Sequence, residues 1–197
     1  MICGILLAAG RSRRMGTQKL LLPFAGQTVV GQIVDQLLAG GIGRLFVVVS
    51  ADREAVAAAL ATKNIILVDN PDPDGDMLSS IRCGLKMLPA ECEAAVIALG
   101  DQPGIRPDLV SRLIQLYIRS PLGIASPIYD GKRGHPIVIA HRFFAPLLAD
   151  FDDQGLHGLL DQYPDEVATL AVDESNMLAD IDLPADYQRL IDSSHAD

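Results

Sequence analysis

Residues 2–40 read "ICGILLAAGRSRRMGTQKLLLPFAGQTVVGQIVDQLLAG" and combine an apolar run, a glycine-framed loop and an amphipathic stretch. The run from Ile2 to Ala8 has the composition of a buried strand and ends at Gly10. Apolar residues then recur at helical spacing until Gly40 and Gly41, at Val29, Val30, Ile33, Val34, Leu37 and Leu38. The order strand, loop, helix is the opening unit of an α/β fold.

The same alternation continues to about residue 120. Further strands are expected at 44–49, 65–68 and 94–99, and helices after Asp52, at 78–88 and after Pro107. Continuous apolar strands that alternate with amphipathic helices predict a mostly parallel sheet covered on both faces. The expected fold class is α/β, a Rossmann-like three-layer α/β/α sandwich.

The alternation loosens in the second half of the chain. The stretch "GIASPIYDGKRGHPIVIA" at 123–140 predicts two strands joined by a glycine-rich turn, with short helices following near 143–148 and 156–163. At 197 residues and 49% hydrophobic content, the chain is expected to fold as a single domain over 1–197.

The charge is unevenly distributed. A net charge of -9 argues against general nucleic-acid binding, which relies on dispersed Lys and Arg. Residues 1–34 nevertheless contain no Asp or Glu, whereas Arg11, Arg13, Arg14 and Lys19 lie within nine positions of one another. This local excess suits a small polyanion.

Other sequence features narrow the class of protein further. Three cysteines without C-x-x-C spacing indicate neither a disulfide framework nor a zinc site. Apolar runs fall short of the roughly 18 residues that span a bilayer, and the N-terminus lacks a cleavable leader pattern. We therefore expect a cytoplasmic protein without a membrane partner.

The loop between Gly10 and Gly16 has the setting of a phosphate site. A loop that leaves a strand and enters a helix presents backbone N–H groups beside a positive helix end, and glycine permits close approach. The P-loop pattern G-x-x-x-x-G-K-[ST] does not fit, since five residues separate the glycines and Lys19 comes three positions later. The dinucleotide fingerprint G-x-G-x-x-G is also absent.

The stretch "LLAAGRSRRMGTQKLLLPFAGQTVV" resembles the signature loop of the MobA-like nucleotidyltransferases, and among them the MocA-type molybdenum cofactor cytidylyltransferases most closely. Further matching segments are "GDMLSSIRCGL" at 75–85, "LGDQPGIRPDLV" at 99–110, "GHP" at 134–136, "DDQGLHGLL" at 152–160 and "ADIDLPADY" at 179–187. The resemblance implies a nucleotide-diphospho-sugar transferase-like fold. Its nucleotide-binding part would span roughly 1–120 and its acceptor-side lobe roughly 121–192.

The resemblance also implies a nucleotide site. Arg14 and Lys19 would contact the triphosphate, and the further nucleotide contacts would come from Leu7, Ala8, Ala9, Gly10, Arg11, Ser12, Ser79 and Ser80. The "LAAG" form of the loop is associated with CTP in this family and "LAGG" with GTP, so CTP is the expected donor. An extra residue, Asp76, lies between Gly75 and Met77. A serine pair at a helix start is also a common capping choice.

A metal site is implied at two acidic segments. Asp101 follows a buried strand and so lies at the carboxyl end of the sheet, where α/β proteins bind ligands and where a carboxylate can hold Mg²⁺. In the resembled family this aspartate is a metal ligand, and a second comes from the C-terminal segment, matching Asp180 first and Asp182 next. Both could instead cap the last helix. Catalytic roles are therefore expected for Arg14, Lys19 and Asp101.

The implied reaction is a phosphoryl-type transfer. A terminal phosphate oxygen of an acceptor attacks the α-phosphorus of CTP, and pyrophosphate leaves, so that positioning and electrostatics supply most of the catalysis. The implied acceptor is a molybdopterin carrying molybdenum, contacted by His135 and His157. His157 stands where relatives have arginine, and a neutral histidine grips a phosphate less firmly. A lone histidine such as His135 is more often structural.

Two alternatives remain open. The enzyme class could hold with GTP or another triphosphate as donor, or with a sugar or isoprenoid phosphate as acceptor. The protein could also be a non-catalytic accessory protein that delivers the finished cofactor to a molybdenum hydroxylase, which would be the receiving partner in either case.

Overall fold

The computed structural model describes residues 1–10, 18–72, 74–152, 154–172 and 180–194. Its main sheet has eight strands in the order β10-β7-β9-β6-β1-β4-β5, with β8 paired to β7. The strands are β1 (Ile2–Leu7), β4 (Arg44–Val49), β5 (Ile66–Asp69), β6 (Ala94–Leu99), β7 (Ile124–Tyr129), β8 (Lys132–Arg133), β9 (Ile137–Ala140) and β10 (Val167–Ala171). A small antiparallel pair, β2 (Pro23–Phe24) and β3 (Gln27–Thr28), lies apart from it.

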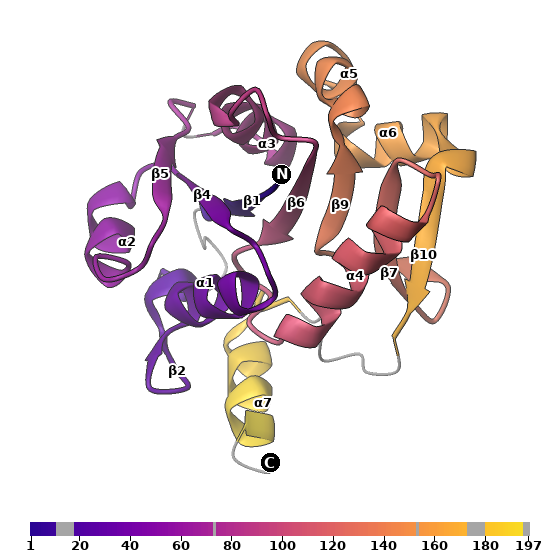
Figure 1. Ribbon diagram of the computed structural model, residues 1–197. Helices are drawn as coiled ribbons and strands as arrows, with labels where there is room; N and C mark the ends of the chain where they lie inside the picture. Colours follow the sequence, from indigo (N-terminus) through magenta and orange to yellow (C-terminus); the bar gives the residue numbers. More distant parts are fainter. Residues whose placement is uncertain (11–17, 73, 153, 173–179, 195–197) are drawn as a thin grey trace.

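The helices surround this sheet (Figure 1). They are α1 (Val29–Ala39), α2 (Arg53–Ala59), α3 (Met77–Met87), α4 (Pro107–Arg119), α5 (Phe144–Ala149), α6 (Gly155–Gln162) and α7 (Pro184–Ser194), with the 3-10 turns η1 (Lys19–Leu21), η2 (His141–Phe143) and η3 (Pro164–Glu166). The expected helix at 78–88 is found one residue earlier, and the expected strand at 65–68 one residue later.

The sheet is parallel from β6 through β1 and β4 to β5. β9 runs antiparallel to both of its neighbours, β6 and β7, and β10 is parallel to β7. Two reversals in succession give β7 and β10 the same direction as β6. The mostly parallel α/β sheet expected from the sequence is therefore confirmed, with one antiparallel strand inside it.

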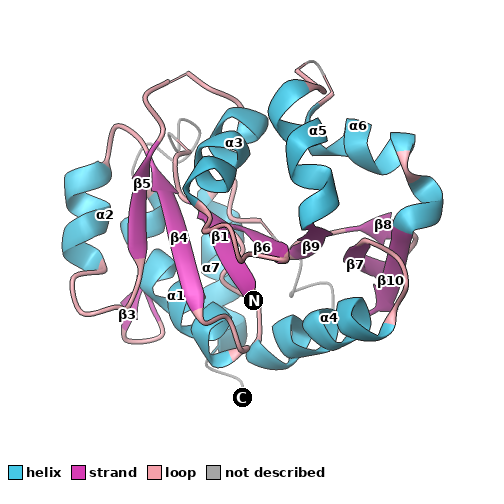
Figure 2. Ribbon diagram, turned by 45° about the horizontal axis from the view of Figure 1, so that its top comes forward, coloured by secondary structure: helices cyan, strands magenta, loops and turns pink. Residues whose placement is uncertain are grey.

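Strand alternation divides the core between the two faces of the sheet. In β1, Leu6 packs with α1, α4 and the C-terminal Leu190, whereas Cys3 and Ile5 pack with α3, α5 and α6. Figure 2 shows α3, α5 and α6 on one side of the strands and α1, α4 and α7 on the other. This arrangement is the expected three-layer sandwich.

Helix α1 begins and ends as its sequence predicts. The hydroxyl of Thr28 accepts a hydrogen bond from the Gly31 amide at 3.2 Å, which caps the first turn. The helix gives way at Gly40, and Gly41 has φ +101, a backbone conformation that glycine adopts without strain. Among the described helices, none is both long and apolar enough to cross a lipid bilayer.

Candidate active site

A cavity of about 240 Å³ opens where β1 and β6 end. Leu7 lies in register with Leu99 in this parallel pair, so the residues that follow the two strands meet at one edge of the sheet. The cavity is lined by Leu7, Ala9, Gly10, Lys19, Leu20, Gly75, Asp76, Met77, Ser80, Leu99, Gly100 and Asp101. Of the residues expected to bind nucleotide, Leu7, Ala9, Gly10, Lys19 and Ser80 thus share one cavity with Asp101.

Lys19 joins three segments of the chain at this cavity. Its ammonium donates hydrogen bonds to the Asp101 carboxylate at 2.7 Å and to the Ile181 carbonyl at 2.8 Å. The Asp182 carboxylate lies 3.6 Å from the same nitrogen. The Lys19 side chain is 11% exposed, so these charges interact in surroundings with limited screening by water. A residue near the start, one from mid-chain and two from the C-terminal segment therefore converge.

The C-terminal segment is also held by its backbone and by Gln102. The Ile181 amide donates to the Asp101 carbonyl at 2.9 Å, and the Gln102 side-chain amide donates to the Asp180 carboxylate at 2.7 Å. Partial burial raises the pKa of Asp180 above its ordinary value, and the negative charges of Asp101 and Asp182 act in the same direction. Asp180 is thus held by Gln102 beside the cluster that Lys19 forms with Asp101 and Asp182.

The helix-cap alternative for these acids is not what the described residues form. The backbone amides of Asp182 and Leu183 donate to the carboxylate of Asp186 at 3.1 and 2.7 Å, so Asp186 serves the N-terminus of α7. The Asp180 carboxylate accepts from Gln102, and the Asp182 carboxylate lies near Lys19.

These residues fit a divalent metal. Asp101 and Asp182 already share one positive group, and Mg²⁺ is commonly bound by one or two carboxylates together with substrate phosphates. Over the described residues, no group of three or more His, Cys, Asp or Glu side chains is arranged to hold a metal. An ion here would accordingly depend on a phosphate ligand and water to complete its coordination.

The two serines of α3 have different surroundings. Ser80 lines the cavity, whereas Ser79 does not; the Asn70 amide donates to their hydroxyls at 3.0 and 3.1 Å. The first turn of α3 is capped by Asp76, whose carboxylate accepts from the Ser79 amide at 2.8 Å. The serine pair is therefore bound to Asn70, and the helix cap is the extra residue Asp76.

Ala8 differs from its neighbours Leu7 and Ala9. Its side chain is turned into the core by strand alternation and the residue is 4% exposed. Its amide donates to the Val48 carbonyl of β4 at 2.8 Å. It is not among the residues that line the cavity. Arg11, Ser12 and Arg14, which were expected to contact the nucleotide, lie outside the described residues.

A second cavity of about 330 Å³ adjoins the first and shares Asp76 and Met77 with it. It contains both histidines that were expected on the acceptor side. The other lining residues are Leu78, Arg133, Gly134, Ile137, Gln154, Gly155, Leu156 and Leu160. The second cavity thus has an apolar floor and a polar rim, and the start of α3 separates it from the first.

His135 is the more buried of the two histidines. Burial lowers its pKa from 6.5 to about 4; the Asp101 charge opposes this shift, and His157 adds to it. Its Nε2 atom is shielded from water and has no hydrogen-bond partner among the described residues. His135 is therefore a neutral imidazole at neutral pH, with an unused nitrogen beside the second cavity.

Sequence reasoning missed Asn70, Gln102 and Arg133. Gln102 belongs to the "GDQP" motif, so its position beside Asp101 was a usable signal. Asn70 follows β5, whose carboxyl end lies at the same edge as those of β1 and β6, but its partners on α3 depend on the packing of that helix. Arg133 is brought to the second cavity by the short β8 strand.

Taken together, the parallel strand ends, the cavity between them and the cluster of Lys19 with carboxylates define an α/β protein with a charged cavity at the carboxyl edge of its sheet, where α/β proteins bind ligands. Residues 4–167 match the family model for the MobA-like NTP transferase domain. The chain belongs to the MobA-like NTP transferase family, as its signature loop indicated.

Relatives in this family carry different names. The chain is 31% identical over 200 residues to nicotine blue oxidoreductase of Paenarthrobacter nicotinovorans, covering 96% of each protein. It is 25% identical over 188 residues to the molybdenum cofactor cytidylyltransferase of Escherichia coli, covering 93% of this chain and 92% of that protein. Family membership is therefore shared by proteins with distinct named activities.

Solved structures agree with the fold. Rv0371c of Mycobacterium tuberculosis superposes with a TM-score of 0.85 at 31% identity over 98% of both chains. The same protein has been crystallised in complex with manganese, at a TM-score of 0.80 and 30% identity over 98% of each chain. A 4-diphosphocytidyl-2C-methyl-D-erythritol synthase from Anaerococcus prevotii shares the fold at a TM-score of 0.80 and 17% identity, over 99% of this chain and 96% of that one. The nucleotidyltransferase-like fold is thereby confirmed, and a divalent metal is compatible with the family.

Proposed function

We propose that the protein is a Mg²⁺-dependent nucleotidyltransferase that transfers CMP from CTP to a molybdopterin-type cofactor and releases pyrophosphate. The observation that carries the proposal is the Lys19 ammonium, which meets the Asp101 carboxylate at 2.7 Å and lies 3.6 Å from that of Asp182 inside a cavity at the strand ends. A cation and two acids at this place suit a triphosphate and its metal.

The first cavity would receive the nucleotide. Lys19 can contact the triphosphate, and Gly10 allows its backbone to approach, since a Cβ there would meet no atom within 4 Å. Asp101 and Asp182 would hold the metal, with Asp180 as the further acid beside them. A divalent ion bound there supplies charge neutralisation for the phosphates. Ser80 can offer its hydroxyl to the sugar or base, and Arg11, Ser12 and Arg14 belong to the same proposed nucleotide site.

The second cavity would receive the acceptor. Its common wall with the first, Asp76 and Met77, would let an acceptor phosphate come close to the α-phosphate of the nucleotide. His135, which is neutral at neutral pH, and His157 both line this cavity and would contact the acceptor. This assignment divides the chain into a nucleotide-binding part at roughly 1–120 and an acceptor-side lobe at roughly 121–192. A molybdenum hydroxylase would receive the product.

The test is pyrophosphate release by the purified protein with Mg²⁺, molybdopterin carrying molybdenum, and CTP, GTP, ATP or UTP in turn. CTP is expected to give the fastest release, and faster release with GTP would contradict the choice of donor. Release with a sugar or isoprenoid phosphate but not with molybdopterin would contradict the acceptor.

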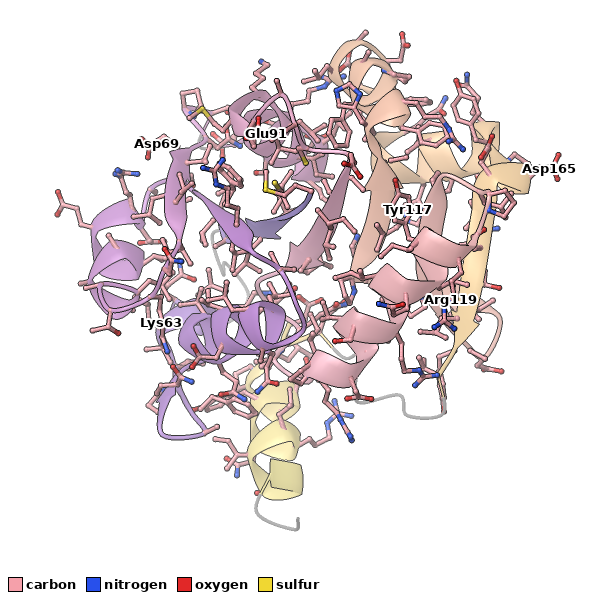
Figure 3. The ribbon with its side chains drawn as sticks, viewed as in Figure 1. Lys63, Asp69, Glu91, Tyr117, Arg119 and Asp165 are labelled. Atoms are coloured by element: carbon pink, nitrogen blue, oxygen red, sulfur yellow. The ribbon has the colours of Figure 1, made fainter. Side chains whose placement is uncertain are left out.

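A substitution tests the catalytic site itself. Asp101→Asn is expected to lower kcat by on the order of 100-fold, because one ligand of the metal loses its charge. The matched control is Asp165→Asn, since Asp165 precedes β10 and lies at the outer margin of the molecule (Figure 3). Release that survives Asp101→Asn would argue against metal catalysis here. Cofactor delivery to a hydroxylase without any pyrophosphate release would instead indicate a carrier.

A second candidate function is an oxidoreductase. It is favoured by the relative named nicotine blue oxidoreductase, which is 31% identical over nearly the whole chain. Two adjoining cavities could hold a redox cofactor and its partner, although the dinucleotide fingerprint is absent from the sequence. Consumption of NADH or NADPH with a quinone-like dye, followed by its absorbance and unaffected by Asp101→Asn, would favour this candidate over the transferase.

A further inference from the structure

Arg82 connects α3 to the segment between α5 and α6. Its Nε donates to the Leu147 carbonyl at 2.8 Å, and its Nη2 donates to the Asp150 carbonyl at 2.8 Å. Its Nη1 contacts the Asp152 carboxylate. The Arg82 side chain is 21% exposed, whereas the Asp152 side chain is 72% exposed, so the contact with this acid is open to water.

The three nitrogens of the Arg82 guanidinium each contact a different acceptor. The last turn of a helix leaves carbonyl groups without partners inside the helix, and here Arg82 supplies donors to two carbonyls at the end of α5. The planar fork can reach several acceptors at once, which a single ammonium cannot reproduce. Arg82 therefore links one helix, the end of another and the acid that follows it.

The bound segment includes a backbone position that needs support. Phe151 lies between the two residues that Arg82 contacts, Asp150 and Asp152, and has φ 76. A non-glycine residue in the left-handed region is disfavoured unless its surroundings hold it there. Phe151 also packs against the cluster on the α3 side of the sheet. The Arg82 contacts on both sides of Phe151 are suited to hold this conformation.

The consequence reaches the second cavity. The chain passes from Asp152 into α6, whose beginning supplies Gln154, Gly155, Leu156 and His157 to the cavity wall. The start of α3, with Asp76 and Met77, lines the same cavity and also borders the first one. Arg82 thus connects the helix that borders both cavities to the segment that leads into the α6 part of the second cavity wall.

We infer that Arg82 is a positioning residue that fixes the Gln154–His157 wall of the second cavity against α3 and so sets the affinity for the acceptor. This inference rests on the proposed function for the identity of the acceptor, and on the contacts of Arg82 for the position of the wall. The nucleotide cavity should be little affected, because Lys19 and Asp101 are held by bonds that do not involve Arg82.

The test compares Arg82→Gln, Arg82→Lys and Asp152→Asn with the control Arg142→Gln. Arg142 also bridges two segments, through Glu166 at 2.5 Å, but it lies near the start of β10 and away from both cavities. Hydrogen–deuterium exchange of the ligand-free proteins measures the rate of amide exchange in residues 150–160. Steady-state kinetics report KM for acceptor and for CTP separately.

For Arg82→Gln we expect amide exchange in 150–160 to quicken by at least about tenfold, KM for the acceptor to rise by about tenfold, and KM for CTP to stay within about twofold. Arg82→Lys should restore part of both effects, and Asp152→Asn, which keeps the two carbonyl contacts, should be milder. Arg142→Gln should leave all three quantities unchanged.

Two results would overturn the inference. One is unchanged exchange in 150–160 in Arg82→Gln, which would show that the contacts do not hold the wall. The other is an equal rise in KM for CTP and acceptor, which would indicate a general structural role. Should Arg82→Gln fail to fold, the same comparisons are made with Arg82→Lys and Asp152→Asn. A wild-type protein without transferase activity would count against the proposed function, while the exchange result would still decide the role of Arg82.

Discussion

Folding strongly lowers the pKa of His135. Its pKa falls from 6.5 to about 4 through burial, so the unfolded chain binds a proton in this range that the folded protein does not. The free energy of unfolding should therefore decrease as the pH falls from 6.5 to about 4, by at most about 3 kcal/mol from this group. Above pH 6.5 the group contributes no pH dependence.

The check is urea denaturation of the metal-free protein from pH 4 to 8, for the wild type and His135→Asn. The difference between the two free energies should vary with pH below 6.5 and be constant above it. Parallel curves over the whole range would show that His135 has an ordinary pKa. His157, the other histidine of this cavity, offers the control substitution His157→Asn.

At the residue scale the sequence predicted which segments meet at the cavity better than it predicted the contacts of their side chains. The "GDQP" motif and the basic loop indicated that Asp101 and Lys19 belong to one site, and the structure brings them to 2.7 Å. Spacing could not predict whether Asp180 or Asp182 lies nearer to Lys19. This depends on how the backbone turns where Ile181 enters the core. The partners of Ser79 and Ser80 likewise depend on Asn70, which lies on a different element.

Helix α3 packs closely against β1 at Gly84. A Cβ at Gly84 would lie 2.6 Å from Cγ2 of Ile5, a fully buried residue of β1. Gly84→Ala is expected to lower the free energy of unfolding by about 1–2 kcal/mol, because an overpacking cost of up to about 3 kcal/mol exceeds the gain in helix propensity of roughly 1 kcal/mol.

Chemical denaturation measures this effect. Gly43→Ala is the matched control, since a Cβ at Gly43 would meet no atom within 4 Å. An equal or higher stability of Gly84→Ala would show that α3 can move away from β1 without cost. Because α3 borders both cavities, we also expect Gly84→Ala to bind CTP and the acceptor more weakly.

At the scale of elements the sequence predicted most of the strands and helices with ends correct to within a residue or two. Apolar runs such as 44–49 and 94–99 are strands with the predicted bounds. The strand β10 was missed because "VATLA" is short and half-exposed, so it carries neither a continuous apolar run nor a long alternation. The direction of β9 was also beyond the sequence, since pairing depends on which strands lie beside it.

At the scale of the whole molecule, the C-terminal segment around Ile181 contributes to both the core and the candidate site. Ile181 is fully buried in the core beneath α1 and α4, although it lies next to two acids in the sequence. Ile181→Ala should lower the free energy of unfolding by about 2–5 kcal/mol through loss of buried surface and the cavity left behind. It should also lower catalytic activity, because a segment with less packing would hold the Ile181 carbonyl, which accepts a hydrogen bond from Lys19, less firmly in place.

Denaturation and pyrophosphate release test these two effects in the same variant. Leu183→Ala is the control, because Leu183 is 51% exposed and should tolerate the change. A stable Ile181→Ala protein with full activity would contradict the view that this segment is part of both core and site. The packing of Ile181 depends on residues that are distant in sequence. Local patterns therefore identified Asp180 and Asp182 as candidate site residues but could not predict their positions.

The amino terminus emerges at the end of β1 away from Lys19 and Asp101, and its ammonium pairs with Glu93 at 2.9 Å. Six residues of extended chain, roughly 20 Å, separate that end from the cavity. An affinity tag or fluorescent fusion attached before Met1 would therefore lie at the opposite end of β1 from the first cavity. A label attached behind α7 would instead extend from a helix whose Tyr187 hydroxyl donates to the Pro23 carbonyl, next to the η1 turn that carries Lys19. For binding measurements the protein is therefore best immobilised through its N-terminus.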